Sequence, residues 1–283
     1  MVIEDAGGNP VNLAKAVLKQ LPDLGGPVPV REIAAAVDIY EIREETLDRL
    51  EGGLIMPDDK SEGAILVNAD RPDTRKRYTI GHELGHFLNP WHLPPTPAGF
   101  RCGPKDMAAE TYKQGDRAAQ MEVEANQFAA ELLMPSEQVR MHLRRLSGID
   151  IDHILSMANR FDVSRESAAR RYIASHDEPA AVVFSKDGVI RYVKRHQYFP
   201  ALDVWGGDRL PATSISERSS LPIGRVSDWN DLDGGDWLRE PKGRRVCEQT
   251  LAQQSGYRLT LIALEEIEDE DEDEDWAPPT FRR

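Results

Sequence analysis

The stretch YTIGHELGHFLNPWH, Tyr78–His92, carries three histidines and one glutamate. His82, Glu83 and His86 fit the H-E-x-x-H pattern of zinc hydrolases. On a helix, His82 and His86 lie one turn apart on one face, so both imidazoles can bind one metal ion with Glu83 beside it. A bound zinc would acidify a water molecule, and Glu83 would accept the proton. The stretch therefore predicts a helical metal site with Glu83 as the catalytic base.

Two glycines give this helix a bare side. Gly81 and Gly85 are four residues apart, so a second element of the fold can approach the helix closely there. The motif is short, and its alternative interpretation is an ordinary amphipathic helix with surface histidines. A third ligand elsewhere in the sequence would decide between the two, since two histidines do not complete a catalytic zinc site.

The segment DRAAQMEVEANQFAAELLMP, 116–135, supplies that candidate. It predicts a helix that is capped by Asp116 and ends at Pro135. Glu122 and Asn126 lie one turn apart at the edge of its apolar stripe, where a carboxylate is costly unless it is paired or binds a metal. We expect Glu122 to be the third ligand and Asn126 to hydrogen-bond a histidine. The alternative is a buried carboxylate paired with an arginine.

Two other residues compete with Glu122 for this role. His92 is a rival because HELGHFLNPWH differs from the longer pattern H-E-x-x-H-x-x-G-x-x-H only by Asn89 in place of glycine. Pro90, however, favours extended backbone at Asn89 and opposes the turn that would bring His92 to the metal, so we expect His92 on a proline-rich loop. Glu124 is expected on the polar face of its helix. That face is predicted to hold Gln120, Glu124, Gln127 and Glu131.

Taken together, RKRYTIGHELGHFL and EVEANQFAAELLMP closely resemble the ImmA/IrrE family of metallo-endopeptidases, over about residues 28–175. The resemblance rests on H-E-L-G-H, on the E-x-x-A-N-x-F-A-A core and on the closing L-L-M-P. It implies a zincin-like fold and a zinc (Zn2+) or manganese (Mn2+) cofactor. It places metal ligands at His82, His86 and Glu122, and the general base at Glu83. It also implies a substrate class, namely helix-turn-helix transcriptional repressors that are cut once in a stress or mobile-element response.

The rest of the chain predicts an α+β protein with a zincin-like domain over 1–176, a smaller C-terminal α/β module over 177–264 and an acidic, disordered tail over 265–283. Residues 12–37 read as two helices, and GAILVN, Gly63–Asn68, reads as a strand that is either interior or a sheet edge able to accept substrate. The strands AAVVFS and VIRYVK flank Asp187–Gly188 and predict a β-hairpin, VCEQTLAQQSG predicts a short helix ending at Gly256, and YRLTLIAL predicts a strand. No helix-turn-helix segment is recognised, so we expect any repressor to be a separate protein.

Charge and composition limit the class of partner. The formal net charge is -14, but the run EEIEDEDEDED, Glu265–Asp275, holds ten of the acids, so the remaining chain is only mildly acidic. Direct binding to nucleic acid is therefore not expected. The sequence contains no long apolar run, no signal-peptide pattern and only two cysteines, which favours a cytoplasmic protein without a membrane segment.

Cys102 raises a separate question. The peptide RCGPKD, Arg101–Asp106, resembles the cysteine-switch peptide of matrix metalloproteases, although here it lies between the predicted ligands. Cys102 is either an ordinary loop thiol or a thiol that reaches the metal from a flexible loop. Two functions stay open as well: a metal-dependent endopeptidase, and a non-catalytic, metal-stabilised regulator that sequesters a repressor or antitoxin. Glu83 favours the enzyme, because a purely structural site does not need it.

Overall fold

A computed structural model describes residues 6–22, 25–96, 99–218 and 220–265. The chain divides into two compact units, Met1–Glu178 and Pro179–Arg283, and each is described by itself. The expected disordered tail lies outside the described residues from 266 onward. Among the residues described, no helix is both long and apolar enough to cross a membrane.

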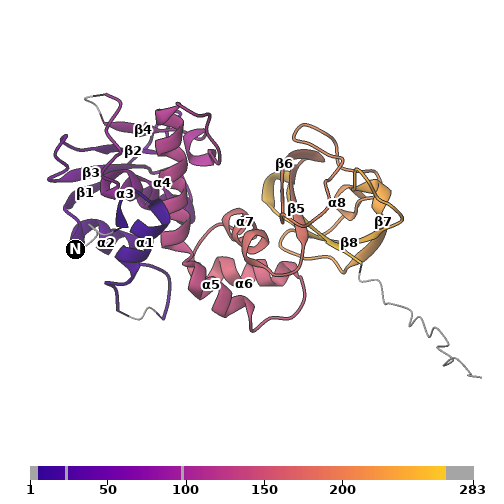
Figure 1. Cartoon of the computed structure of the whole chain (residues 1–283). Helices are drawn as coiled ribbons and strands as arrows, with labels where there is room; N and C mark the ends of the chain where they lie inside the picture. Colours follow the sequence, from indigo (N-terminus) through magenta and orange to yellow (C-terminus); the bar gives the residue numbers. More distant parts are fainter. Residues whose placement is uncertain (1–5, 23–24, 97–98, 219, 266–283) are drawn as a thin grey trace, which may run out of the picture. The chain divides into compact units, whose positions relative to one another are not determined.

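The first unit combines one sheet with helices, which confirms the mixed α+β class (Figure 1). Its helices are α1 (Pro10–Leu18), α2 (Val30–Ala36), α3 (Asp73–Leu88), α4 (Arg117–Leu133), α5 (Ser136–Leu143), α6 (Ile151–Phe161) and α7 (Arg165–Ser175). Its strands are β1 (Ile39–Glu45), β2 (Gly52–Ile55), β3 (Gly63–Asn68) and β4 (Phe100–Cys102), in the order β1-β3-β2-β4. The predicted cap is present, because Asp116 accepts from the amide of Ala119. Ser164 caps α7 in the same way by accepting from the amide of Ser167.

The order of the strands settles the question left open for Gly63–Asn68. Strand β3 pairs in parallel with β1 on one side and antiparallel with β2 on the other. It is therefore interior, and the possibility that it receives substrate as an added strand is wrong, because both of its backbone edges are already paired. Strand β4 pairs antiparallel with β2 and stands at the end of the sheet.

Helix α3 packs directly against α4, and its glycines make this possible (Figure 1). A Cβ atom added at Gly85 would lie 3.0 Å from the Cα of Ala125, and one at Gly81 would lie 3.5 Å from the Cβ of Ala129. Residues 79–88 of α3 are all buried. The second half of α3 is thus enclosed on every side, including the side that carries the histidines, and the surface-histidine interpretation of the motif is excluded.

The second unit is built on a five-stranded antiparallel sheet in the order β6-β5-β9-β8-β7. Its elements are β5 (Ala180–Lys186), β6 (Val189–Arg195), α8 (Ile215–Arg218), β7 (Asn230–Asp233), β8 (Arg245–Ala252) and β9 (Tyr257–Leu264). The hairpin predicted at Asp187–Gly188 is confirmed, with both residues at positive φ. The helix predicted in VCEQTLAQQSG is wrong: the segment forms β8, which lies between β7 and β9. Residues 248–252 of β8 are all buried, so both faces of this part of the strand are covered. A strand covered on both faces does not need the alternation of polar and apolar residues by which a strand is recognised in a sequence.

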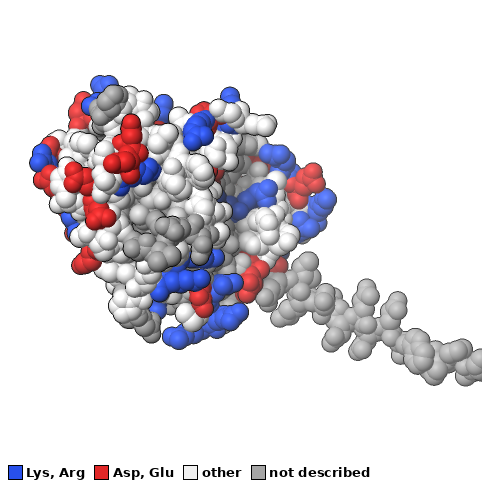
Figure 2. All heavy atoms as spheres, turned by 60° about the vertical axis from the view of Figure 1, so that its left-hand side comes forward, with Lys and Arg blue, Asp and Glu red and all other residues white. Residues whose placement is uncertain are grey.

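Charged side chains are mixed on the face of the molecule in Figure 2, where acidic and basic residues are interspersed among uncharged ones. Some of them form exposed ion pairs, as between Arg43 and Glu41 at 3.0 Å. Exposed pairs of this kind add little to stability. The charges that bear on function are buried in the first unit.

Candidate metal centre

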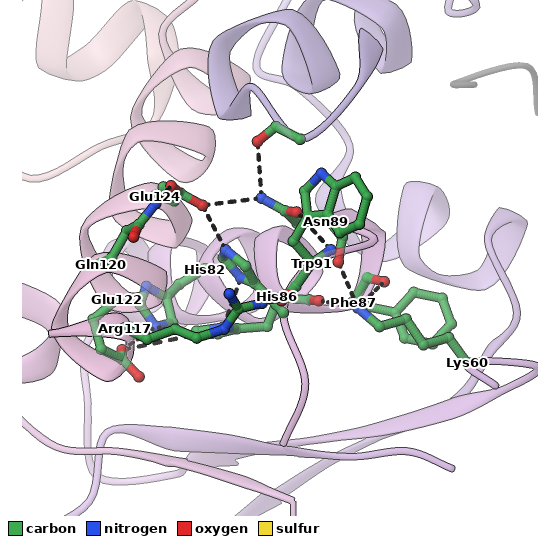
Figure 3. A network of polar contacts seen from close by, with 12 residues as sticks. Lys60, His82, His86, Phe87, Asn89, Trp91, Arg117, Gln120, Glu122 and Glu124 are labelled. Atoms are coloured by element: carbon green, nitrogen blue, oxygen red, sulfur yellow. Dashed lines mark hydrogen bonds and ion pairs between the residues drawn. The ribbon is translucent and has the colours of Figure 1, made fainter. Parts of the chain in front are cut away.

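Three of the predicted site residues meet at one point between α3 and α4 (Figure 3). The Nε2 atoms of His82 and His86 are 3.1 Å apart. The carboxylate oxygen Oε2 of Glu122 lies 3.2 Å from Nε2 of His82 and 3.5 Å from Nε2 of His86. Both histidines are completely buried. The three ligand atoms therefore form a nearly equilateral triangle within a closed interior.

This triangle fits a metal ion. A tetrahedral zinc with nitrogen and oxygen ligands at about 2.0–2.1 Å separates neighbouring ligand atoms by about 3.3 Å, which matches the three distances. The chemistry of the donors also fits, since imidazole nitrogen and carboxylate oxygen are both zinc ligands. The group His82, His86, Cys102 and Glu122 has one ligand atom from each residue, all within 4.8 Å of one another.

The electrostatics of the cluster favour a cation at its centre. Burial would raise the pKa of Glu122, but the neighbouring His82 and His86 rings outweigh it and hold that pKa well below its usual range. Burial lowers the pKa of His86 to about 3, so this ring is neutral, as a metal ligand must be. Burial also opposes a charge on His82, yet the neighbouring Glu122 and Glu83 carboxylates raise its pKa. The two carboxylates thus favour a positive charge in the region where a metal would lie.

Glu83 is buried beside this triangle without a hydrogen bond. Its side chain has no exposed surface, and among the described residues neither of its carboxylate oxygens has a hydrogen-bond partner. Burial raises the pKa of Glu83 to about 7, although the charge of His82 opposes the shift. A Cβ atom added at Gly52 of β2 would lie 2.3 Å from Cγ2 of Thr79 and 3.4 Å from Oε1 of Glu83. The glycine therefore lets β2 approach α3 closely beside the carboxylate.

Asn126 fixes the orientation of His82. Its Oδ1 atom lies 2.9 Å from Nδ1 of His82 and also accepts a hydrogen bond from the Tyr78 hydroxyl at 2.8 Å. Its Nδ2 group donates to the backbone oxygens of Asp106 and Ala109. With Nδ1–H of His82 donating to this amide, the lone pair on Nε2 is free to bind a metal. The sequence did not point to Tyr78, whose hydroxyl completes this support.

His92 and Glu124 form a second support, next to His86. Nδ1 of His92 lies 3.1 Å from Nδ1 of His86, and Nε2 of His92 lies 2.9 Å from Oε2 of Glu124. His92 thus faces the side of His86 opposite to the ligand nitrogen. Asn89 has extended backbone, as Pro90 predicts, but His92 is buried instead of lying on an outer loop. Glu124 accepts from Gln120 of its own polar face, as expected, and also from His92 and Asn89.

The buried carboxylate paired with an arginine exists on α4, but it is not Glu122. Glu131 is buried, forms an ion pair with Arg171 at 2.6 Å and accepts hydrogen bonds from Ser136. Its expected position on the polar face is wrong, because α5 and α7 supply partners that cover this end of the helix. Glu122 instead faces the two histidines.

Two further residues lie near the centre, and only one of them, Cys102, stood out in the sequence. Lys60 donates to the backbone oxygens of His86 and Asn89, at 2.9 and 2.6 Å, and so closes the end of α3 (Figure 3). Cys102 is buried in β4, with its Sγ atom 4.0 Å from Nε2 of His86. Its description as a flexible-loop thiol is wrong. Burial, together with the Glu83 and Glu122 carboxylates, raises the pKa of this thiol well above its usual range.

The chain is similar to known proteins in two respects, a family match in sequence and a match in structure. Residues 48–172 match the model of the Peptidase_M78 family, described as the IrrE N-terminal-like domain, which confirms the resemblance to ImmA/IrrE. No curated protein matches in sequence. A solved Mycobacterium tuberculosis transcriptional regulator matches in structure with a TM-score of 0.55 and 13% identity, over 90% of this chain and 75% of that one. At that identity, the match supports a shared fold alone.

Proposed function

We propose that this chain, whose residues 48–172 match the model of the IrrE N-terminal-like domain, is a metal-dependent endopeptidase with a centre formed by His82, His86, Glu122 and Glu83. The observation that carries the proposal is the state of Glu83. A carboxylate that is enclosed and has no partner is costly, and proteins retain such groups where chemistry requires them. The family supports a metallopeptidase-type function in general terms.

Each residue has a defined part in the proposed reaction. His82, His86 and Glu122 would hold the ion, which we propose to be zinc, with manganese as the alternative. When bound, the metal supplies Lewis acidity toward water and toward the peptide carbonyl. Glu83 takes a proton from the attacking water at one of its carboxylate oxygens and delivers it to the leaving amine nitrogen. Asn126 keeps the Nε2 atom of His82 directed at the centre.

The proposed substrate is a helix-turn-helix transcriptional repressor encoded separately from this chain. The support for it is the family resemblance of the two motifs. Cleavage in a flexible segment of such a repressor would separate its DNA-binding part from the remainder. A cytoplasmic location and a role in a stress or mobile-element response belong to the same proposal.

A second function is favoured by one observation. Cys102 offers a fourth ligand atom, and a centre with four protein ligands is typical of structural zinc. In that case the chain would be a non-catalytic regulator that holds a repressor or antitoxin in a complex. The unpartnered Glu83 favours the enzyme, because a structural centre has no use for a buried base.

Labelling of new protein N-termini tests the proposal. Cell extract from the source organism is incubated with the metal-loaded wild type or with Glu83→Gln, and the new termini are identified by mass spectrometry. We expect a new terminus in a helix-turn-helix protein with the wild type alone, while both proteins contain equal metal. Equal sets of termini from the two proteins would contradict the enzyme. A repressor that both proteins capture without cutting would instead support the regulator.

A further inference from the structure

The strand β4 brings a thiol to the centre, in a position that the proposed reaction does not use. Cys102 is the last residue of β4, and its side chain has no exposed surface. Its Sγ atom lies 4.0 Å from Nε2 of His86, and the ligand atoms of the whole group lie within 4.8 Å of one another. The thiol therefore faces the same point as the two imidazoles and the Glu122 carboxylate.

The distances place this thiol just short of a metal bond. In a tetrahedral zinc site, sulfur at about 2.3 Å and nitrogen at about 2.0–2.1 Å from the metal are about 3.6 Å apart. The observed 4.0 Å to His86 exceeds that separation by a few tenths of an ångström, and other ligand atoms of the group are up to 4.8 Å apart, so the sulfur would have to move closer in order to bind. Because the other three ligand atoms can form one face of a tetrahedron, Cys102 is the side chain of the group that is left for the fourth position. This is the position that a catalytic zinc leaves to water or substrate.

The surroundings of Cys102 do not resemble an apolar core. The thiol lies beside the Glu83 carboxylate as well as His86. Behind it, the chain turns sharply at Gly103, whose amide donates to the side chain of Asp106 at 2.8 Å. Strand β4 is three residues long and is paired on one side by β2. Binding of the sulfur would require a movement of this short end strand, of the Cys102 side chain or of the facing ligands.

We propose that Cys102 is a fourth protein ligand that closes the centre in the resting protein. The proposal rests on the proposed function, because it concerns the same metal. On ligation, the thiol loses its proton to solvent, and the sulfur takes the place of a coordinated water. The resting chain is then latent because it has no open coordination position. Displacement of Cys102 opens that position to water or substrate.

Cobalt(II) substitution tests the ligation directly and needs no substrate. A thiolate bound to cobalt gives an intense charge-transfer absorption in the near ultraviolet, which imidazole and carboxylate do not give. We expect this band in the wild type, its loss in Cys102→Ser, and its retention in Cys247→Ser. Cys247 is the matched control, because it lies on β8 of the other unit and donates to Asp231. A wild type that binds one cobalt without the band would overturn the proposal.

Two further measurements keep the result decisive if Cys102→Ser folds poorly. X-ray absorption of the zinc-loaded wild type should show one sulfur at about 2.3 Å, whereas a shell of nitrogen and oxygen alone would contradict the proposal. In competition with a chelator, Cys102→Ser should bind zinc at least ~10-fold more weakly, the lower end of the range for loss of an outer partner. Unchanged affinity would also overturn it. A wild type that binds neither metal would contradict the proposed function instead, which separates the two failures.

Discussion

Two glutamates, one in each unit, are completely buried, and they differ in what surrounds them. In the second unit, Glu248 accepts hydrogen bonds from the Ser214 hydroxyl at 2.7 Å, from the Ser216 amide at 3.1 Å and from Trp237 Nε1 at 3.1 Å. In the first unit, Glu83 has no hydrogen-bond partner among the described residues. Burial raises the pKa of both carboxyl groups. Burial and a shifted pKa alone therefore do not mark a functional group.

The hydrogen-bond partners of a buried carboxylate distinguish a structural group from a functional one. The donors around Glu248 compensate for the water that folding removes, so this carboxylate belongs to the structure of the sheet. Glu83 lacks that compensation and lies beside two imidazoles and a second carboxylate whose spacing fits a metal. An ion and a water molecule would complete its surroundings. The comparison thus separates a carboxylate kept for stability from one kept for reaction.

The largest effect is expected when a metal ligand next to Glu83 is removed. Glu122→Ala leaves two imidazoles, so we expect zinc affinity to fall by more than the ~100-fold that marks the upper range for outer partners. Metal content after dialysis against a mild chelator measures it. Glu124→Ala is the matched control on the same helix, and it should retain most of its metal. If Glu122→Ala stays loaded while His92→Ala is emptied, the ligand assignment is incorrect.

The next effect concerns Glu248 and the stability of the second unit. Glu248→Ala strips three donors of their acceptor, including Trp237 Nε1, and should lower the free energy of unfolding of the second unit by about 3 kcal/mol. Denaturant unfolding followed by tryptophan fluorescence measures the change. Glu248→Gln keeps the shape and one acceptor oxygen, so its loss should be smaller. A mutant of unchanged stability, or one with less metal, would show that Glu248 is not a purely structural group.

A smaller effect shows how the ligands are held. Asn126→Ala removes the acceptor of the Nδ1 proton of His82, and zinc affinity should fall by about 10–100-fold. Chelator competition measures this loss, and Tyr78→Phe, which removes only the hydroxyl contact to Asn126, should lose less. Equal metal affinity in the wild type and Asn126→Ala would mean that packing alone orients the ring.

The smallest effect is expected at the end of the second support. Glu124 acts on the centre through His92 and His86, so Glu124→Gln, which can still accept a hydrogen bond, should weaken zinc binding by less than about 10-fold. The same chelator competition applies. A loss as large as that of Glu122→Ala would place Glu124 among the ligands.

Sequence patterns over a few neighbouring residues predicted helix α4, the β-hairpin and the metal-site residues. Helix α4 follows from its apolar stripe and the Asp116 cap, and the hairpin follows from Asp187–Gly188. The meeting of His82, His86 and Glu122 was also expected, since helical spacing and one costly carboxylate pointed to it. These features depend on neighbours within a few residues along the chain, or on a motif with a defined chemistry.

Contacts between distant segments were beyond those patterns. Glu131 looked exposed because Arg171, its partner, lies forty residues further along. Strand β8 looked helical because its sequence does not show that Glu248 is buried. Its hydrogen-bond partners, Ser214 and Trp237, come from other segments of the chain. Cys102 looked like a loop thiol because strand β4 has only three residues and is held by pairing with β2. In each case the tertiary partner, not the local sequence, determines the environment.

Anomalous X-ray diffraction at the zinc absorption edge, from crystals of the zinc-loaded chain, tests the central claim most directly. The account predicts one peak in the first unit, about 2.0–2.2 Å from Nε2 of His82, Nε2 of His86 and the Glu122 carboxylate, with Glu83 beside the metal but not bonded to it. A peak bonded to His92 or Glu124, a bond to Glu83, or no peak between α3 and α4 would contradict it.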